Sequence, residues 1–313
     1  MQIGKKISIN QNFLSLILAT FRGISQVILI ENALSGFIIL LAITISSYQL
    51  GIIAVLSSLI GTIVAKIGGA DEVKVNQGLF GYNSVLTGIA LALFLNGPYQ
   101  WIIVLIGAGI ASIVTATIMH IMRNSGLPIL TFPFIILTWF MLLIPYYLDA
   151  FKLSSELIPQ DLASRQLNRL GTINWTEGIF SGIGQIFFLD SMLPSILIFI
   201  AIFLFNIRTG IYAVLGNLTA VIIAFFLGAE PHLISIGLYG YNAILTILAV
   251  SIVFNDKKHP LTIFGGIFAA CLSVLITASI SSLLVPYGLP ILTMPFVLCS
   301  WMFLSAKKIL HKL

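Results

Sequence analysis

The chain contains the same short sequence twice. The ten residues Gly78–Thr87 recur as Gly237–Thr246 with the same Gly, Tyr, Asn and Thr positions, at an offset of 159 residues. A Gly-Leu-Pro-Ile-Leu-Thr-x-Pro-Phe segment follows in each half, at Gly126–Phe134 and at Gly288–Phe296, where the offset has grown to 162. Shared Gly, Pro and Asn at a near-constant offset predict a tandem duplication. The fold should therefore consist of two similar halves.

The composition identifies the solvent of these halves as lipid. Hydrophobic residues make up 59% of the chain and charged residues 8%, whereas soluble domains carry about 25% charged residues. The mean hydropathy is +1.10. Fifteen Lys and Arg with ten Asp and Glu cannot cover the surface of a soluble globule of 34.0 kDa, because such surfaces are rich in charge. We expect an integral membrane protein.

Several other classes are excluded at this stage. The pI of 9.2 does not indicate nucleic-acid binding, because the basic residues are scattered and form no phosphate-binding face. Cys271 and Cys299 lie in apolar segments without a CxxC or Cys/His ligand pattern, so we expect no metal and no other cofactor. The apolar run 13–21 resembles a signal peptide, but Arg22 follows it directly and we expect it to be retained.

Ten apolar runs are long enough to cross about 30 Å of hydrocarbon as helices. They lie near residues 32–48, 50–67, 77–95, 100–122 and 127–148 in the first half, and near 191–207, 210–228, 236–254, 261–285 and 289–306 in the second. Two further apolar pieces, Phe13–Ile30 and Ile179–Leu189, contain Gln, Gly or Arg. Polar groups at mid-bilayer need a partner or a cavity, so these pieces predict short or re-entrant helices.

The loop charges predict that the two halves have opposite orientations. The first half carries Lys66, Lys74 and Arg123 in loops whose counterparts lack basic residues, while the second carries Arg208 and Lys257–Lys258 in the loops that are uncharged in the first. With five crossings per half, the positive-inside rule places both termini in the cytoplasm. We therefore assign 1–148 to the first repeat, 149–177 to an extracytoplasmic linker and 178–313 to the second repeat.

The repeated polar residues of the interior are neutral: Gln26 and Gln185, and Thr131 and Thr293. Inverted repeats place their site near the midplane on broken helices, and ion-driven carriers use charged groups there. The two prolines in each Gly-Leu-Pro motif should break the helical ladder and leave carbonyls as a row of acceptors. An amide supplies donors and an acceptor in one plane. These features favour a slot for a flat, uncharged amide.

In these motifs the sequence resembles the urea transporter family, from about Phe13 to Trp301. The resemblance rests on the paired Gly-Leu-Phe/Tyr-Gly-Tyr-Asn and Leu-Pro-x-Leu-Thr-x-Pro-Phe motifs together with the two glutamines. It implies an all-α membrane protein with two inverted five-crossing repeats, each with an additional short or re-entrant helix, around a central pore. It also implies a homotrimer in the plasma membrane, or in the inner membrane of a bacterium, that passes urea down its gradient without acting as an enzyme.

The resemblance also implies roles for individual residues. Gln26 and Gln185 would hold urea at the two ends of the filter, although some relatives have a glutamate at one of these places. Thr131 and Thr293 would line the constriction. The apolar walls would be formed by Leu86, Leu245, Val27, Ile186, Leu29 and Phe188. Leu29 stands where an aromatic residue is common in relatives.

Alternative interpretations remain open at this stage. The glutamines could tie helices together, and Gly81-Tyr82-Asn83 with its repeat counterpart is expected to be structural. Glu31 and Asp190 could carry protons, but acidic residues at a helix start are more often caps. The solute could be ammonia or a short amide in place of urea. A membrane enzyme is disfavoured because HExxH and Gly-x-Ser-x-Gly motifs are missing.

Overall fold

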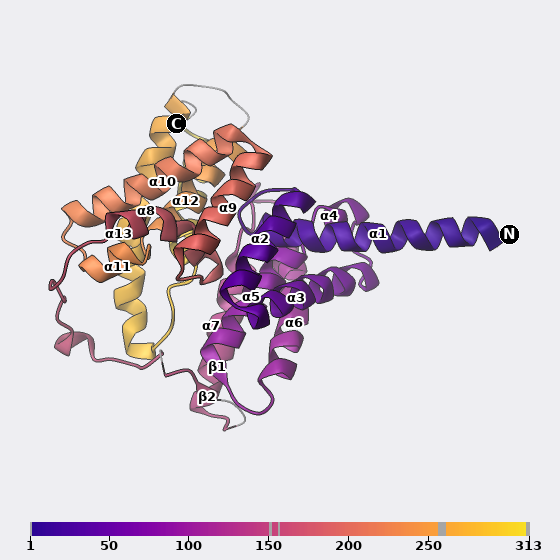
Figure 1. Ribbon diagram of the computed structural model, residues 1–313, viewed down its shortest axis with the longest axis horizontal. Coiled ribbons are helices and arrows are strands. Elements are labelled where there is room, and N and C mark those ends of the chain that lie inside the picture. The colour runs from indigo at the N-terminus through magenta and orange to yellow at the C-terminus, as the bar shows by residue number, and fades with distance from the viewer. Residues whose placement is uncertain (1, 150–151, 156, 256–260, 311–313) are drawn as a thin grey trace.

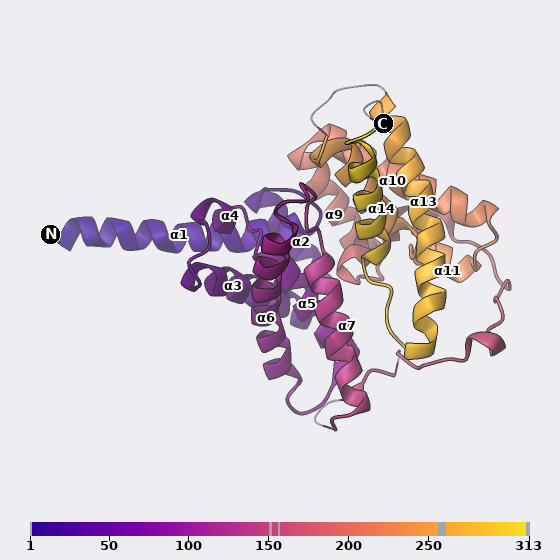
Figure 2. The ribbon, with the colours of Figure 1, turned by 180° about the vertical axis from the view of Figure 1, so that it is seen from behind.

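The computed structural model describes residues 2–149, 152–155, 157–255 and 261–310, without the side chains of residues 2–12 and 261. Lys257 and Lys258, the basic residues of one second-half loop, lie outside the described residues, as do Lys312 near the C-terminus and the side chains of Lys5 and Lys6 near the N-terminus. Helices α1 to α7 form one half of the molecule and α8 to α14 the other, side by side (Figures 1 and 2).

The helices follow one another with short connections. The first half contains α1 (Gln2–Gln26), α2 (Ala33–Ser46), α3 (Tyr48–Ile67), α4 (Glu72–Asn76), α5 (Gly81–Phe94), α6 (Gln100–Met122), α7 (Phe132–Leu143) and the 3-10 turn η1 (Ile144–Tyr146). The second contains α8 (Trp175–Gly184), η3 (Gln185–Phe187), α9 (Met192–Phe205), α10 (Ile207–Phe226), α11 (Pro231–Ser235), α12 (Gly240–Leu248), the π-helical η4 (Ala249–Val253), α13 (Leu261–Leu284), η5 (Val285–Tyr287) and α14 (Met294–Ala306).

The linker between the halves has little regular structure. It contains the turn η2 (Leu162–Ser164) and the strand β2 (Lys152–Leu153), which pairs antiparallel with β1 (Leu95–Asn96) of the first half. Within the described residues, these two short strands depart from the expected all-α fold. Helix α8 begins at Trp175, which is inside the stretch assigned to the linker from the sequence.

Helix length repeats between the halves. Helices α3 and α10 both have 20 residues, which is about 30 Å and enough to cross a bilayer. In the described residues four helices, α3, α6, α10 and α13 with η5, are long and apolar enough to span, and α8–η3 with α9 would be a fifth span bent by 77°. The other apolar helices have 10–17 residues. The count of ten crossings therefore stays a prediction.

Two of the predicted spans are only partly helical. The spans 127–148 and 289–306 begin with extended backbone, and their helices α7 and α14 start at Phe132 and Met294. The physical reason is proline, which lacks the N–H of the helical ladder and is tolerated in the first turn, where Pro133 and Pro295 lie.

The two short helices expected before the spans differ in length. The second, α8 with η3, is short as predicted. The first is wrong as a short helix, because α1 runs for 25 residues from Gln2 and only its part from Phe13 to Gln26 is counted as apolar. α1 ends at Gln26, and α8 with η3 ends at Phe187, just after Gln185.

Repeat counterparts also terminate and cap the helices. Ser47 ends α2 and Asn206 ends α9, each with extended backbone. The same two side chains then accept from backbone N–H groups of the next helix, Leu50 at 3.4 Å for Ser47 and Thr209 at 3.3 Å for Asn206. A Ser or Asn at this position satisfies N–H groups that have no partner inside the helix.

The halves meet along two seams. Helix α2 lies beside α9 (Figure 1), and Ser35 donates from its hydroxyl to the Ala201 carbonyl at 3.0 Å. At the second seam α7 lies beside α14 (Figure 2). One hydrophobic cluster includes buried residues of both halves, among them Phe134, Phe187 and Leu245. The two halves therefore share one core, and the motif residues of both lie in it.

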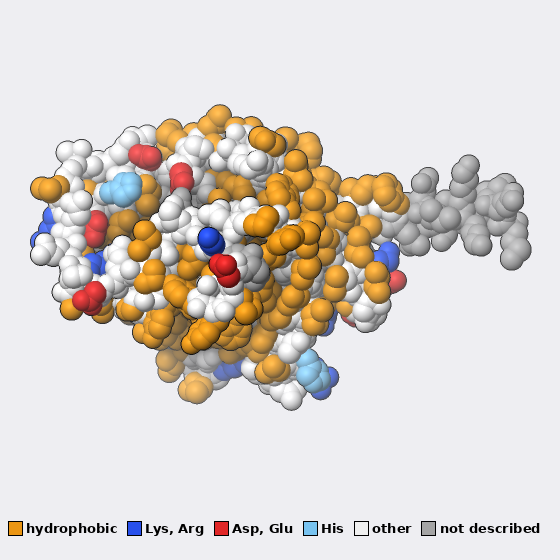
Figure 3. Space-filling model, turned by 90° about the horizontal axis from the view of Figure 1, so that it is seen from below, with side chains coloured by type: hydrophobic (Ala, Val, Ile, Leu, Met, Phe, Trp, Pro, Cys, Tyr) orange, Lys and Arg blue, Asp and Glu red, His pale blue; other side chains and the backbone are white. Residues whose placement is uncertain are grey.

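The outer surface is apolar over wide areas. Figure 3 shows hydrophobic side chains over most of one face, with few charged ones between them. Large side chains such as Ile106 on α6, Phe140 on α7 and Phe268 on α13 are more than half exposed. Exposed apolar area on this scale fits contact with lipid and agrees with the composition.

Candidate functional site

Each half contains a helix that stops in the same left-handed turn. In the first half the turn follows Gln26, where Leu29 has φ +62° and its N–H donates to the Gln26 carbonyl at 2.9 Å. In the second, Phe188 has φ +59° and donates to the Gln185 carbonyl at 3.1 Å. Such backbone costs of order 1–3 kcal/mol for a residue other than glycine and persists only where the surroundings impose it.

A second break precedes α7 and α14. Leu130 and Leu292 have φ of +51° and +52°. The Tyr82 hydroxyl donates to the Leu130 carbonyl at 2.6 Å, and the Tyr241 hydroxyl donates to the Leu292 carbonyl at 2.7 Å. All four non-glycine residues with positive φ in the described chain are therefore at the two breaks of each half.

Thr131 and Thr293 meet at these second breaks. They are the N-cap residues of α7 and α14, and their Oγ1 atoms lie 2.7 Å apart in a hydrogen bond. Their exposed fractions are 2% and 3%. The repeat relation therefore brings the two predicted constriction residues together at the boundary between the halves.

The carbonyls of the broken segments have partners, which the sequence prediction did not foresee. Trp139 donates from Nε1 to the Pro290 carbonyl and Trp301 from Nε1 to the Pro128 carbonyl, both at 2.8 Å. The prediction that these carbonyls leave the helical ladder is correct. The four carbonyls of Pro128, Leu130, Pro290 and Leu292 do act as acceptors, and each already accepts one hydrogen bond from a side chain of the protein.

The two glutamines are half-buried and their amide nitrogens are held. Gln26 donates from Nε2 to the Gln77 carbonyl at 3.1 Å, and Gln185 donates from Nε2 to Asp190 Oδ1 at 2.9 Å. The bond to Asp190 also corrects one expectation about the acids. Asn32 caps α2 by accepting from the Ser35 N–H at 2.9 Å, so neither Glu31 nor Asp190 is the helix cap that the sequence suggested.

The predicted apolar walls belong to the shared core. Val27 and Ile186 are 1% exposed, Leu86 and Leu245 are fully buried, and Leu29 and Phe188 pack against the same cluster. Phe188 meets Phe94 of α5 edge-on, with ring centroids 5.5 Å apart. The end of the broken helix in the second half thus packs on a helix of the first.

A cavity of 520 Å³ opens beside Gln26. We call it the Gln26 vestibule; it is lined by Gln26, Leu29, Tyr82 and Leu130 and, from the second half, Val253 and Phe254. Glu31, Lys74 and Arg123 line it as well. The structure therefore brings Gln26 and Leu29 into one cavity with residues next to the constriction, whereas Gln185 and Phe188 line none of the described cavities.

The Gly-Tyr-Asn motif has the structural role expected for it, and its tyrosine has a further role that was not predicted from the sequence. Asn242 donates to the Leu292 carbonyl at 3.4 Å and accepts from the Phe296 N–H at 3.1 Å, on both sides of Thr293. Asn83 instead donates to Thr115 Oγ1 at 3.1 Å. The tyrosines that hold the second breaks were missed, although their repetition within the motif was a usable signal.

The sequence was then compared with known proteins. The pattern of the urea transporter family matches residues 17–308. The chain belongs to the urea transporter family. Urea transporter 1 of Ovis aries and that of Mus musculus are each 26% identical to it over 298 residues, which is 90% of this chain and 75% of theirs. Urea transporter 1 of Rattus norvegicus is 26% identical over 302 residues, with the same coverage. Together with the long apolar helices, membership makes this a multi-pass membrane protein of a transport family.

Proposed function

We propose that this chain passes urea down its concentration gradient through a narrow path between the two repeats. The path runs from the Gln26 vestibule past the Thr131–Thr293 pair to Gln185. The observation that carries the proposal is the buried contact between the two threonine hydroxyls at the junction of the broken helices. The relatives' printed name supports urea as the solute.

The hydroxyl pair would work as a neutral constriction. Two hydroxyls in direct contact close the path to larger solutes and to ions, which cannot leave their hydration shells in an apolar sheath. Urea carries donors and an acceptor in one plane, so it can replace the bond between the threonines with bonds of its own. Exchanging one hydrogen bond for another has a small net cost, on the order of 1 kcal/mol or less.

The apolar walls would select the shape of the solute. Leu86, Leu245, Val27 and Ile186 are buried around the breaks, and Leu29 and Phe188 stand at the two left-handed turns. Flat apolar walls exclude water from the faces of a planar amide while its edges bond to Gln26, Thr131, Thr293 and Gln185. Permeation of this kind requires no coupled ion. Glu31 and Asp190 are exposed, and their exposure does not favour proton coupling through them.

A flux experiment tests the function directly. Purified protein is reconstituted into liposomes and an inward urea gradient is imposed without a proton or sodium gradient, with light scattering as the measure of vesicle reswelling. We expect faster urea entry than in empty liposomes. Equal rates would contradict the proposal, and a larger protein-dependent increase for ammonia or acetamide than for urea would replace urea as the solute.

The proposal includes an orientation and an assembly. The two halves would be inverted repeats with the linker outside, both termini in the cytoplasm, and three copies in the plasma membrane, or in the inner membrane of a bacterium, each with its own pore. Reciprocal bonds such as Trp139 to Pro290 and Trp301 to Pro128 support a two-fold relation between the halves. Single cysteines placed in the linker or at the C-terminus of the protein, and labelled in whole cells, test the orientation. The mass of the detergent-extracted protein tests the trimer.

A further inference from the structure

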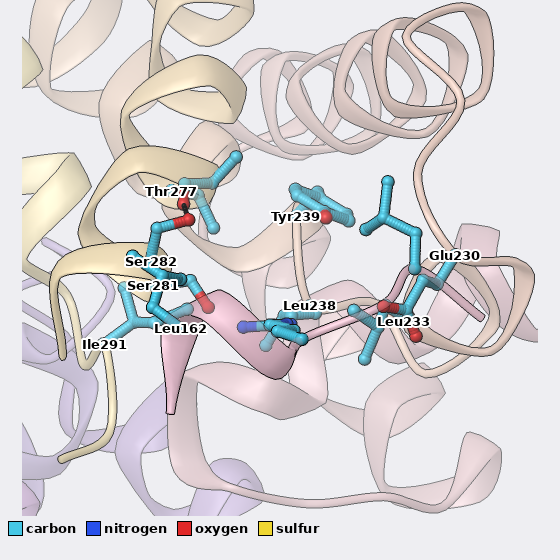
Figure 4. A pocket seen from close by; sticks show the side chains of 12 residues that line it. Leu162, Glu230, Leu233, Leu238, Tyr239, Thr277, Ser281, Ser282 and Ile291 are labelled. Atoms are coloured by element: carbon cyan, nitrogen blue, oxygen red, sulfur yellow. Dashed lines mark hydrogen bonds between the residues drawn. The ribbon is translucent and has the colours of Figure 1, made fainter. Parts of the chain in front are cut away.

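A second cavity lies under the linker, away from the ten residues of the predicted filter. It measures 180 Å³ and is enclosed by linker residues of the segment 162–167 and by residues that follow α10 and lie on α13. We call it the linker cavity. Figure 4 shows Thr277, Ser281 and Ser282 on one wall and Tyr239, Leu233 and Glu230 on the opposite wall.

The linker cavity is the repeat counterpart of part of the Gln26 vestibule. Four pairs of residues at the repeat offsets line the two cavities: Lys74 with Leu233 and Leu79 with Leu238 at 159, and Met119 with Ser281 and Ile129 with Ile291 at 162. Because the Gln26 vestibule leads to the filter in the first half, its counterpart belongs to the approach to the filter in the second.

The counterparts differ in size and polarity. The Gln26 vestibule measures 520 Å³ and the linker cavity 180 Å³. Where the first half has Met119, the second has Ser281, a shorter and polar side chain. The linker residues Leu162, Arg165 and Leu167 close the linker cavity from outside.

The linker is hydrogen-bonded first to the first half and then to the chain just after α13, beside the cavity. Its first part pairs with β1 and its Ser154 N–H donates to the Phe94 carbonyl at 2.9 Å. The Gln160 N–H then donates to the Val285 carbonyl at 3.1 Å, at the end of α13. Asp161 accepts from the Ala163 N–H at 3.0 Å, which shapes the turn that covers the cavity. The segment therefore has a defined place across the mouth.

The hydrogen-bonding groups of the cavity are arranged for an amide. The Thr277 hydroxyl donates to the Ser273 carbonyl at 2.7 Å and the Ser282 hydroxyl to the Ala278 carbonyl at 3.1 Å. The donor capacity of both is used, and Thr277 is fully buried, so Ser282 is the hydroxyl that offers a solute an acceptor. Glu230 is a further acceptor, and the Arg165 guanidinium is a donor; both act electrostatically on Tyr239. A solute with N–H donors and one carbonyl acceptor satisfies this set.

We propose that the linker cavity is an antechamber that binds urea, or a planar amide like it, before it reaches the filter on the linker side. This rests on the proposed urea transport. The carbonyl oxygen of the solute would accept from Arg165, and its N–H groups would donate to Glu230 and to the Ser282 hydroxyl. A captured solute raises the local concentration at the mouth, so the antechamber lowers the urea concentration needed for half-maximal flux from this side.

The first half supplies the substitution that tests the antechamber. Ser281→Met places the side chain of Met119 at its repeat counterpart and narrows the cavity. We expect the half-saturating urea concentration to rise about fivefold, the factor for one lost hydrogen bond of ~1 kcal/mol, with an unchanged maximal rate. The matched control is Ser279→Met on the same helix, because Ser279 is exposed and lies outside the cavity.

A labelling experiment measures occupancy without transport. Ser281→Cys and Ser279→Cys are treated with a small, membrane-impermeant thiol reagent with and without urea. We expect urea to slow labelling at position 281 and not at position 279. Absence of protection at 281, or Ser281→Met flux identical to that of Ser279→Met, would overturn the antechamber. If unsubstituted protein passes no urea, the transport proposal fails instead, so the two failures are distinguishable.

Discussion

The hydroxyls of Thr131 and Thr293 are 2.7 Å apart, although 162 residues separate them in the chain. Each stands at the start of a helix, directly after a leucine with left-handed backbone. Their contact is the point at which the two halves meet along the proposed path. Five experiments test this contact and the repeated residues that hold the broken helices in place.

Thr293→Val tests the constriction. Valine keeps the shape but leaves the buried Thr131 hydroxyl without a partner, which should lower stability by ~1–3 kcal/mol. Urea flux should fall about tenfold, since ~1.4 kcal/mol of added barrier is a factor of ten. The double variant Thr131→Val/Thr293→Val should regain stability, because both partners are then apolar, and should stay slow. Recovery of flux together with stability would remove the threonines from the path; Thr293→Ser is the control and should transport normally.

Gln26→Leu and Gln185→Leu test the ends of the filter. Each removes an amide that the proposal places in contact with urea, and each should slow flux about two- to tenfold, the range for one hydrogen bond of ~0.5–1.5 kcal/mol. Membrane insertion and thermal stability should be retained, since both side chains are half-buried. Gln49→Leu, at an exposed position of α3, controls for loss of an amide as such. Flux equal to that of Gln49→Leu would place the two glutamines outside the filter.

Leu130→Ile tests the left-handed backbone. A β-branched residue is strongly disfavoured at positive φ, so this variant should lose ~1–3 kcal/mol from backbone strain. Leu91→Ile is a fully buried exchange in the middle of α5 and should cost less than ~1.5 kcal/mol. Thermal unfolding in detergent compares the two. Equal losses would show that the turn at Leu130 is not under strain.

Trp139→Phe and Trp301→Phe test the reciprocal bonds between the halves. Each leaves a proline carbonyl without its indole donor, and each should lower stability by ~1 kcal/mol. Because the two bonds have the same length, the two shifts in unfolding temperature should be alike. Trp101→Phe removes a half-exposed indole of α6 and should have little effect. A loss in one variant alone would contradict the two-fold relation.

Gly237→Ala tests a close backbone contact. Gly237 has φ +80°, and a Cβ there would lie 2.4 Å from the Gly182 nitrogen; Gly78 has the same conflict with the Gly23 nitrogen. We expect either alanine variant to yield little folded protein. Gly69 has φ +73° with nothing within 4 Å of its Cβ position, so Gly69→Ala should cost only ~1 kcal/mol. Recovery of folded Gly237→Ala at the level of Gly69→Ala would refute the contact. Fluorescence-detected gel filtration of detergent extracts measures the yield.

Some features could be predicted from the sequence because they depend on local chemistry. The 159-residue offset predicted two halves, and their helices repeat in length. Gln, Gly and Arg within two apolar pieces predicted short or re-entrant helices; α8 with η3 is short, whereas α1 runs for 25 residues. The paired prolines predicted a break in the helical ladder, because a missing N–H has a cost at a known position, and α7 and α14 begin only at Phe132 and Met294.

Other features depended on contacts between distant residues. The role of Asp190 follows from Gln185 turning toward it, and a spacing of five residues across a helix break cannot show this. The carbonyls of Pro128 and Pro290 were correctly predicted to leave the ladder, but their partners are indoles from the opposite half. Such partners are set by how the halves pack, which no local pattern contains.

The sequence by itself determined that the chain lies in lipid, that it is a duplication, and that its repeated interior groups are neutral. Residue type alone carries that information, through hydropathy, offset and charge. Only the tertiary structure decided that Thr131 meets Thr293 and that linker residues close a cavity beside α13. Those facts depend on two halves closing on one core, where burial and hydrogen-bond satisfaction act on residues more than a hundred positions apart.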